Sequence, residues 1–239
     1  MWKKRYLLAL ALAGSLCVQT SYSAQKWEIK RSHYYLTGQQ QQLLELPPPP
    51  AAGSEIDIAD LATLHEWQEK RTDAQCARAN AEANADYSVL FDKINPFPEP
   101  LPVAAAAVLK RVKTETDDIA RIVKNKFKRP RPFNRDSSLE PCLGRIGGLA
   151  YPSGHATISR IYALILSDLA PEHMSEFMTR ADEVALYRVI GGVHHPTDIE
   201  AGKKLADTIY PLYLKSAAFQ ADMNTLRGYL LRAPVGSTR

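Results

Sequence analysis

The sequence has no stretch of alternating polar and apolar residues long enough to predict a β-strand. It also has no internal repeat and no glycine-rich strand–turn–helix loop of the type that binds nucleotide phosphates. Apolar residues recur instead at helical spacing, in segments bounded by proline, glycine and helix-capping residues. These absences, together with the periodicity, predict an all-α fold.

Only one long hydrophobic run is present, from Tyr6 to Val18. A basic tripeptide precedes it and small polar residues follow it, which is the pattern of a secretory signal peptide. We therefore predict a signal peptide over residues 1–23 and a periplasmic or secreted mature protein. The run is short for a membrane span, so we expect no stable span after cleavage. An uncleaved N-terminal anchor is the alternative.

The chain has little net charge once the predicted signal peptide is removed. Its formal charge of +4 at pH 7 includes Lys3, Lys4 and Arg5, and residues 1–23 contain no acid, so the mature chain carries +1. A nearly neutral chain argues against nucleic acid as the main partner. Any functional positive charge must therefore be local.

Cysteine is also scarce, with three residues in the whole chain. Removal of the signal peptide removes Cys17 and leaves Cys76 and Cys142, which an oxidising compartment would allow to pair. A disulfide between them would close a long loop and stabilise the fold by about 4 kcal/mol in the chain-entropy model. Two buried free thiols are the other interpretation, and the sequence does not decide between the two.

Proline and glutamine are concentrated between residues 24 and 53. Proline runs favour extended conformations, so we predict an extended arm over residues 24–53 and a single all-α domain over residues 54–239. The first helix of this domain has an apolar face formed by Ile58, Leu61, Leu64 and Trp67. We expect a second helix over residues 73–91 and a third from Pro102 to Lys126, with a break near Thr114.

The segment Tyr151-Pro152-Ser153-Gly154-His155 opens a further helix, whose apolar residues recur at helical spacing. The first turn of a helix presents free backbone N–H groups and the positive end of the helix dipole, and so attracts anions. Gly154 allows a ligand to approach the backbone, and Ser153 can cap the helix or donate to an oxyanion. An ordinary helix cap with a solvent-facing His155 is the alternative.

The densest positive stretch extends from Lys124 to Pro132. A solvated helix end explains such a stretch, because basic side chains suit a helix C-terminus, and a nucleic-acid patch is a second explanation. The third is a phosphate clamp, in which Lys124 supplies a compact charge and Arg131 a planar two-pronged donor. Pro130 and Pro132 would hold the backbone on both sides of Arg131.

Two adjacent histidines, His194 and His195, stand between two predicted helices. Asp198 can hydrogen-bond one ring nitrogen of a histidine and leave the other nitrogen free as a base or nucleophile. A zinc site is disfavoured because adjacent histidines diverge and no further His or Cys lies at a usual spacing. A purely structural His–Asp pair is the alternative. Thr197 with Glu200 predicts the capping box of the following helix.

In order and spacing, these three stretches resemble the three-part signature of the type 2 phosphatidic acid phosphatase superfamily. The matching residues are Lys124 and Arg131-Pro132, then Pro152-Ser153-Gly154-His155, then Arg188, His194 and Asp198. The superfamily includes the class A bacterial acid phosphatases and the vanadium haloperoxidases, and the resemblance implies a helical bundle of that type. Tyr187 departs from the signature, which usually has Ser there, and we expect it to change the support of Arg188 rather than abolish the site.

The resemblance implies a role for each matched residue. The phosphoryl oxygens would be bound by Lys124, Arg131, Ser153, Gly154 and Arg188. His194 would attack phosphorus and form a phosphohistidine, Asp198 would orient His194, and His155 would protonate the leaving alcohol and then activate water. His195 and Arg129 receive no role and are expected to be rim or structural residues.

Together with the predicted signal peptide, the resemblance thus implies an exported acid phosphatase that hydrolyses phosphate monoesters of a small molecule without a cofactor or metal. The resemblance also suggests a homodimer. Three alternatives use the same residues: a phosphatase acting on lipid-linked phosphate or diphosphate, a vanadate-dependent haloperoxidase, and a phosphate binder without turnover. A binder would need the cations but neither His155 nor Asp198, and this favours an enzyme.

Overall fold

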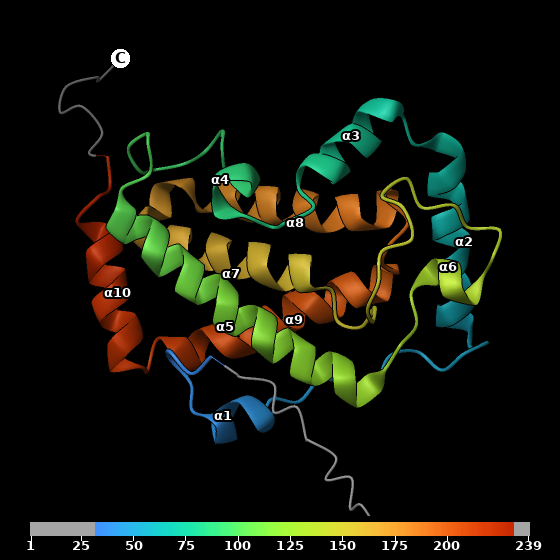
Figure 1. The fold of residues 1–239 in the computed structure, drawn as a ribbon, viewed down its shortest axis with the longest axis horizontal. Helices are drawn as coiled ribbons and strands as arrows, with labels where there is room; N and C mark the ends of the chain where they lie inside the picture. The colour runs from blue at the N-terminus through green and yellow to red at the C-terminus, as the bar shows by residue number, and fades with distance from the viewer. Residues whose placement is uncertain (1–31, 232–239) are drawn as a thin grey trace, which may run out of the picture. The chain divides into compact units, whose positions relative to one another are not determined.

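The computed structural model describes residues 32–231 (Figure 1). The predicted signal peptide over residues 1–23 and the first part of the predicted arm lie outside these residues. No strand occurs within residues 32–231, and the all-α prediction is confirmed. The elements in chain order are α1 (Gly38–Gln42), α2 (Glu55–Lys70), α3 (Asp73–Ala81), α4 (Tyr87–Leu90), α5 (Val103–Phe127), α6 (Pro132–Arg135), α7 (Gly154–Leu169), η1 (Pro171–His173), α8 (Met174–Ile190), α9 (Pro196–Tyr213) and α10 (Ala217–Arg227).

Helix α7 lies at the centre of the fold and packs against α5, α8 and α9 (Figure 1). Its predicted apolar residues Ile158, Ile161 and Ile165 are buried. Tyr162 is also buried, and its hydroxyl donates to the Leu109 carbonyl oxygen of α5 at 3.2 Å. Because three helices surround α7, its first turn lies where side chains from several segments can reach it.

Two helix predictions differ from the structure. The helix predicted over residues 73–91 is divided into α3 and α4 by a turn in which Ala85 has a φ of 50°. The break predicted near Thr114 is wrong, because α5 is continuous and the Thr114 hydroxyl donates to the Lys110 carbonyl oxygen within the helix at 2.8 Å. Pro102 is the N-cap of α5 rather than its first residue.

Helix α2 occupies the predicted position but buries a different face. Leu64 is buried as expected, whereas Ile58 is 59% exposed. Asp57 and Asp60 are buried in its place. Buried carboxylates need cationic or hydrogen-bonding partners, and the segment after α5 supplies them.

The described part of the predicted arm is not extended throughout, since residues 38–42 form α1. The buried carboxylate of Glu115 in α5 holds this segment by accepting from the backbone N–H groups of Tyr34, Tyr35 and Leu36 at 3.1, 2.8 and 2.8 Å. The domain boundary at residue 54 stays a prediction. None of the helices within residues 32–231 combines the length and the apolar character needed to cross a membrane.

Candidate active site

The three predicted motifs meet at one cavity of about 220 Å³. Its lining residues are Asn80, Ala83, Lys124, Arg131, Leu143, Ile146, Gly154, His155, Arg188 and His194. The predicted residues Ser153 and Asp198 do not line the cavity and are completely buried. Segments that are distant in sequence therefore converge on a small space that contains three cationic side chains and two imidazoles.

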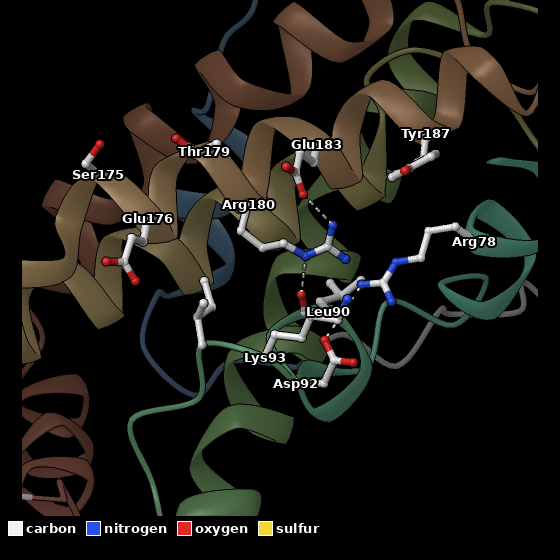
Figure 2. A pocket seen from close by; sticks show the side chains of 11 residues that line it. Arg78, Leu90, Asp92, Lys93, Ser175, Glu176, Thr179, Arg180, Glu183 and Tyr187 are labelled. Carbon is white, nitrogen blue, oxygen red and sulfur yellow. Dashed lines mark hydrogen bonds and ion pairs between the residues drawn. The ribbon is translucent and has the colours of Figure 1, made fainter. Parts of the chain in front are cut away.

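A larger cavity, of about 600 Å³, lies along α8 and faces the end of α4 (Figure 2). Arg180, Glu183 and Tyr187 of α8 line it, with Arg78 and Asp92 facing them (Figure 2). None of its lining residues belongs to the predicted site. Tyr187, the departure from the usual serine, lines this larger cavity, and it is not among the residues that line the smaller one.

Lys124, in the last turn of α5, is held by the loop that precedes α7. Its ammonium donates to the carbonyl oxygens of Leu149, Ala150 and Pro152 at 2.7, 3.2 and 2.6 Å. Burial and the neighbouring charge of Arg131 lower the pKa of Lys124 to about 7. The ammonium can therefore lose its proton near neutral pH, and an anion bound beside it would favour the protonated form.

Arg131 and His194 are in direct contact. The Arg131 Nη1 lies 2.7 Å from His194 Nε2 and donates to the Val193 carbonyl oxygen at 2.9 Å. Because a guanidinium only donates hydrogen bonds, His194 Nε2 is an unprotonated acceptor and Nδ1 carries the hydrogen. Burial and the charge of Arg131 hold the pKa of His194 well below its usual value. His194 is thus a neutral imidazole with its lone pair on Nε2, which suits a nucleophile.

His155 and Arg188 line the same cavity as Lys124, Arg131 and His194. His155 Nε2 lies 3.0 Å from the Glu82 carbonyl oxygen and 3.1 Å from that of Ala83. Because carbonyl oxygens only accept hydrogen bonds, Nε2 carries a hydrogen, and Nδ1 is the nitrogen that can gain or lose a proton. Burial and the charge of Arg188 lower the pKa of His155 to about 3. Arg188 donates to the Ala79 carbonyl oxygen at 3.1 Å, and its buried Nε finds no partner among the described residues.

Ser153 connects the start of α7 to α9. Its hydroxyl accepts from the Ala156 N–H at 3.3 Å as the N-cap, and its own N–H donates to the Asp198 carbonyl oxygen at 2.9 Å. Gly202 of α9 permits this approach, because a Cβ there would lie 2.6 Å from the Ser153 carbonyl oxygen. The sequence interpretation missed Gly202. An isolated glycine inside a helical pattern was the available signal.

Asp198 contacts both histidines, and it lies closer to His195. Its Oδ2 is 2.9 Å from His195 Nδ1 and 3.5 Å from His194 Nδ1, and it accepts from the His195 backbone N–H at 2.8 Å. Burial alone would raise the pKa of Asp198, but the two imidazoles outweigh it and hold this pKa well below its usual range. His195 and Asp198 form the capping box of α9, so the predicted box of Thr197 and Glu200 is wrong.

Arg129 also contacts Asp198, which the sequence interpretation did not foresee. Its Nη1 donates to Asp198 Oδ1 and to Thr197 Oγ1, both at 2.7 Å. Its Nη2 donates to Asp60 Oδ2 at 2.9 Å and to Asp57 Oδ1 at 3.2 Å. Neither Arg129 nor His195 is a rim residue, because both are buried and both contact Asp198. Two aspartates three residues apart on α2 were a weak signal for a buried cation.

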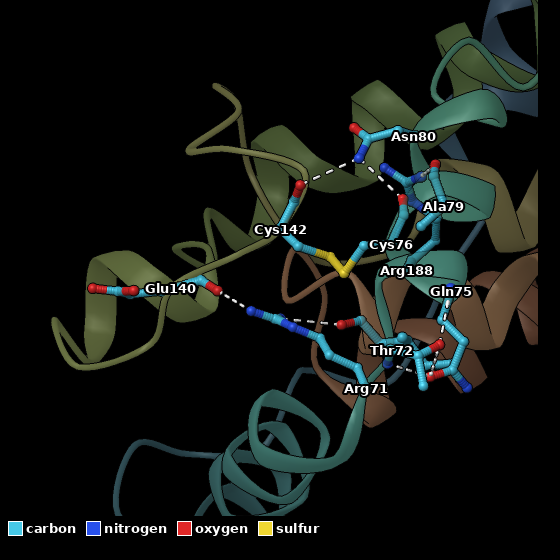
Figure 3. The surroundings of a disulfide bond; sticks show 10 residues. Arg71, Thr72, Gln75, Cys76, Ala79, Asn80, Glu140, Cys142 and Arg188 are labelled. Carbon is cyan, nitrogen blue, oxygen red and sulfur yellow. Dashed lines mark hydrogen bonds between the residues drawn. A yellow bond between two sulfur atoms is a disulfide. The ribbon is translucent and has the colours of Figure 1, made fainter.

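A disulfide between Cys76 and Cys142 joins α3 to the loop before α7 (Figure 3). The Asn80 side-chain amide donates to the backbone carbonyl oxygens of both cysteines, at 3.0 and 3.2 Å. Asn80 and Leu143, the residue after Cys142, both line the smaller cavity. The disulfide therefore ties together two walls of the site.

The cationic side chains and the first turn of α7 make this cavity suited to a phosphoryl group. Guanidinium, ammonium and helix N–H groups are the donors that proteins use for such anions. Within residues 32–231, no group of three or more His, Cys, Asp or Glu side chains is arranged to hold a metal ion. His194 supplies a nucleophilic nitrogen and His155 a titratable one, so the arrangement can support transfer of a phosphoryl group to a side chain.

Comparison with known proteins identifies relatives of this chain. A model of the PAP2 superfamily matches residues 104–214. An acid phosphatase of Zymomonas mobilis is 31% identical over 195 residues, which are 76% of this chain and 72% of that protein. A non-specific acid phosphatase of Providencia stuartii is 30% identical over 116 residues, 46% of each chain.

Solved structures agree on the fold. A bacterial vanadium-dependent chloroperoxidase superposes with a TM-score of 0.59 and 12% identity, over 81% of this chain and 54% of that one. A bacterial vanadium-dependent iodoperoxidase superposes with a TM-score of 0.50 and 20% identity, over 71% of this chain and 52% of that one. At these identities the superpositions bear on the fold alone, and this chain spans about half of each haloperoxidase.

Proposed function

Because this chain belongs to the PAP2 superfamily, we propose that it is an exported acid phosphatase that hydrolyses phosphate monoesters through a phosphohistidine, without a metal ion. The acid phosphatase relatives support phosphatase activity in general. The observation that carries the finer proposal is the unprotonated Nε2 of His194, held 2.7 Å from Arg131 in a cavity that also contains Lys124 and Arg188.

Substrate binding follows from the charges that line the cavity. Lys124, Arg131 and Arg188 bind the non-bridging phosphoryl oxygens, and the Gly154 N–H adds a backbone donor at the start of α7. Ser153 contributes mainly by capping α7, since its hydroxyl accepts from the Ala156 N–H. Charge that develops on the oxygens during transfer meets donors that are already in place.

Phosphoryl transfer starts from the neutral imidazole of His194. The Nε2 lone pair attacks phosphorus, a P–N bond forms and the ester P–O bond breaks, and the leaving oxygen takes a proton from His155. The imidazole becomes positively charged as the P–N bond forms, and the ionised Asp198 stabilises that charge from the Nδ1 side. His155 then removes a proton from water, water attacks phosphorus, and the P–N bond breaks to release phosphate.

His155 must be protonated before the first step, although its pKa lies at about 3 in this arrangement. The charge of Arg188 contributes to that low value. A bound phosphate monoester adds negative charge beside His155 and so raises its pKa. The enzyme should therefore prefer acidic conditions, in which both the substrate and His155 gain protons more readily.

The direct test is hydrolysis of p-nitrophenyl phosphate by the purified mature protein. We expect turnover that persists in EDTA, is inhibited by vanadate, and falls by at least about a thousandfold in His194→Ala, because that variant lacks the nucleophile. His173→Ala is the matched control, since His173 is exposed in η1 and does not line this cavity. Substantial activity in His194→Ala would overturn the mechanism, and loss of activity in EDTA would overturn metal independence.

The substrate is proposed to be a phosphorylated small molecule. A panel of nucleotides, sugar phosphates, phytate and lipid phosphates would identify its class from kcat/KM. A preference for lipid phosphates presented in vesicles would favour the lipid-linked alternative. The homodimer suggested by the resemblance stays a prediction, and light scattering of the mature protein tests it.

Export is proposed from the signal-like N-terminus, and the Cys76–Cys142 disulfide supports it. Disulfides persist in oxidising compartments and are rare in the cytosol. Mass spectrometry of protein recovered from a periplasmic extract should find an N-terminus close to residue 24. A cytosolic protein that retains residues 1–23 would contradict export.

A further inference from the structure

Arg129 is buried, is not among the residues that line the cavity, and pairs with three carboxylates. Its side chain is 4% exposed, and its two terminal nitrogens divide their hydrogen bonds between α9 and α2. One nitrogen contacts Asp198 and Thr197, and the other contacts Asp57 and Asp60. A single guanidinium therefore connects the carboxylate beside His194 to a helix that contributes no residue to the cavity lining.

The two oxygens of the Asp198 carboxylate have different partners. Oδ1 accepts from Arg129 at 2.7 Å, whereas Oδ2 accepts from the backbone and ring of His195 and faces His194 Nδ1 at 3.5 Å. The hydrogen bond from Arg129 to Oδ1 opposes rotation of the Asp198 carboxylate about its Cβ–Cγ bond. The position of Oδ2 relative to His194 therefore depends on Arg129 at Oδ1 as well as on His195 at Oδ2.

The two aspartates of α2 that bind Arg129 have further hydrogen-bond partners of their own. Asp60 accepts from Arg129 and, through its other oxygen, from the Thr197 N–H at 3.1 Å. Asp57 is paired with Arg135 as well, at 2.5 and 2.6 Å. The planar fork of an arginine can satisfy two carboxylates at fixed angles, which a lysine cannot do.

In the buried network around Arg129, the carboxylates outnumber the guanidinium groups. Two guanidinium groups, of Arg129 and Arg135, face three carboxylates, of Asp57, Asp60 and Asp198, so the arginines alone leave one carboxylate charge unmatched. Asp198, the acid of this network beside His194, lies on the Nδ1 side of the imidazole, whereas Arg131 contacts Nε2. The charge of Asp198 offsets the repulsion that a positively charged imidazole would feel from the cations of the cavity.

We infer that Arg129 is a positioning residue for the proposed reaction: through the acids of α2 it fixes Asp198 so that Oδ2 stays directed at His194 Nδ1. The expected effect on kinetics rests on the proposed function. The contact between Arg129 and Asp198 does not depend on it. Arg129 is not among the residues that line the cavity, so it should affect the rate of transfer rather than phosphate binding.

Kinetics of Arg129→Lys and Arg129→Gln test the inference. We expect kcat for p-nitrophenyl phosphate to fall by about 10- to 100-fold, while KM and the inhibition constant of vanadate change by less than about threefold, because a misplaced orienting group affects transfer rather than binding. Arg129→Lys keeps the positive charge among the aspartates. If Arg129→Gln fails to fold, the kinetics of Arg129→Lys alone test the inference. Arg111→Gln is the matched control. It removes an arginine of α5 that makes two hydrogen bonds to Asp222, and neither residue bonds to Arg129 or Asp198.

A second measurement does not depend on turnover. In protein labelled with 15N-histidine, the Nδ1 resonance of His194 should shift in Arg129→Lys and remain unchanged in Arg111→Gln. If the wild-type protein hydrolyses no monoester, the proposed function fails and this resonance still decides the inference. An unchanged Nδ1 resonance, a kcat within threefold of wild type, or an equal loss of vanadate affinity and kcat would each overturn the positioning role.

Discussion

The Nη1 of Arg131 lies 2.7 Å from the Nε2 of His194, so a cation of the proposed phosphate site donates directly to the proposed nucleophile. This contact fixes the tautomer of His194 and contributes to the lowering of its pKa. Arg131 thus helps to keep the imidazole of His194 neutral, and it also supplies positive charge to the cavity proposed to bind the phosphoryl group.

Arg131→Gln should raise the pKa of His194, because removing a neighbouring positive charge favours the imidazolium. A titration of the His194 ring nitrogens by NMR measures this change. The same variant should lose about 10²- to 10³-fold in kcat/KM, the usual cost of removing a preorganised donor. An unchanged His194 pKa would contradict the electrostatic role given to Arg131.

Lys124 should set the upper pH limit of oxyanion binding, because its pKa lies at about 7. This pKa is lower than that of an ordinary lysine, so below pH 7 the ammonium is present and above pH 7 it is progressively lost. Competitive inhibition by sulfate, whose charge is constant over this range, should weaken above pH 7 in the wild-type protein. In Lys124→Arg the weakening should move to higher pH, while the exposed control Lys126→Arg should behave as wild type. A sulfate inhibition constant that does not change up to pH 9 would exclude this assignment.

The Cys76–Cys142 disulfide closes a loop with a sequence separation of 66 residues. Removing it in Cys76→Ser/Cys142→Ser should lower the free energy of unfolding by about 4 kcal/mol, mainly because the unfolded chain regains conformational freedom. Chemical denaturation of the double variant and of the oxidised wild type measures the difference. A reducing agent should shift the wild-type midpoint toward that of the variant, and equal midpoints in all cases would contradict this stabilisation.

Gly202 should tolerate no side chain, since a Cβ there would lie 2.6 Å from the Ser153 carbonyl oxygen and 2.9 Å from the Ala156 Cβ. Gly202→Ala is expected to lower the free energy of unfolding by about 1–3 kcal/mol, as overpacking does, and to lower kcat by moving Asp198 away from Ser153. Gly228→Ala is the control, because its nearest contact would be an ordinary 3.4 Å. Equal stability and activity of the two variants would contradict the close approach of α7 and α9.

The fold class could be predicted from local patterns in the sequence, and the charged and imidazole side chains of the cavity from the resemblance of three ordered motifs to a known family. The spacing of Ile158, Ile161 and Ile165 predicts the central helix, and its first turn carries His155. The ordered motifs indicate which distant residues share a cavity, and the structure brings Lys124, Arg131, Gly154, His155, Arg188 and His194 together.

The supporting residues could not be predicted because their roles depend on tertiary packing. The apolar pattern of α2 assigns Ile58 to the core, but three-dimensional pairing with Arg129 buries Asp57 and Asp60 instead. His195 likewise looks dispensable in the sequence, and only the turn into α9 reveals its contact with Asp198. Periodicity detects hydrophobic burial, whereas a buried ion pair has no period in the sequence.

The covalent intermediate on His194 is the central claim, and trapping it is the most direct measurement. Wild-type protein would be mixed with labelled substrate, quenched in base within milliseconds, digested and mapped by mass spectrometry. We expect a phosphoryl group on His194 that is stable in base, labile in acid and absent from His194→Ala. Rapid turnover with no phosphorylated His194 at any quench time, or a phosphoryl group on another residue, would contradict the account.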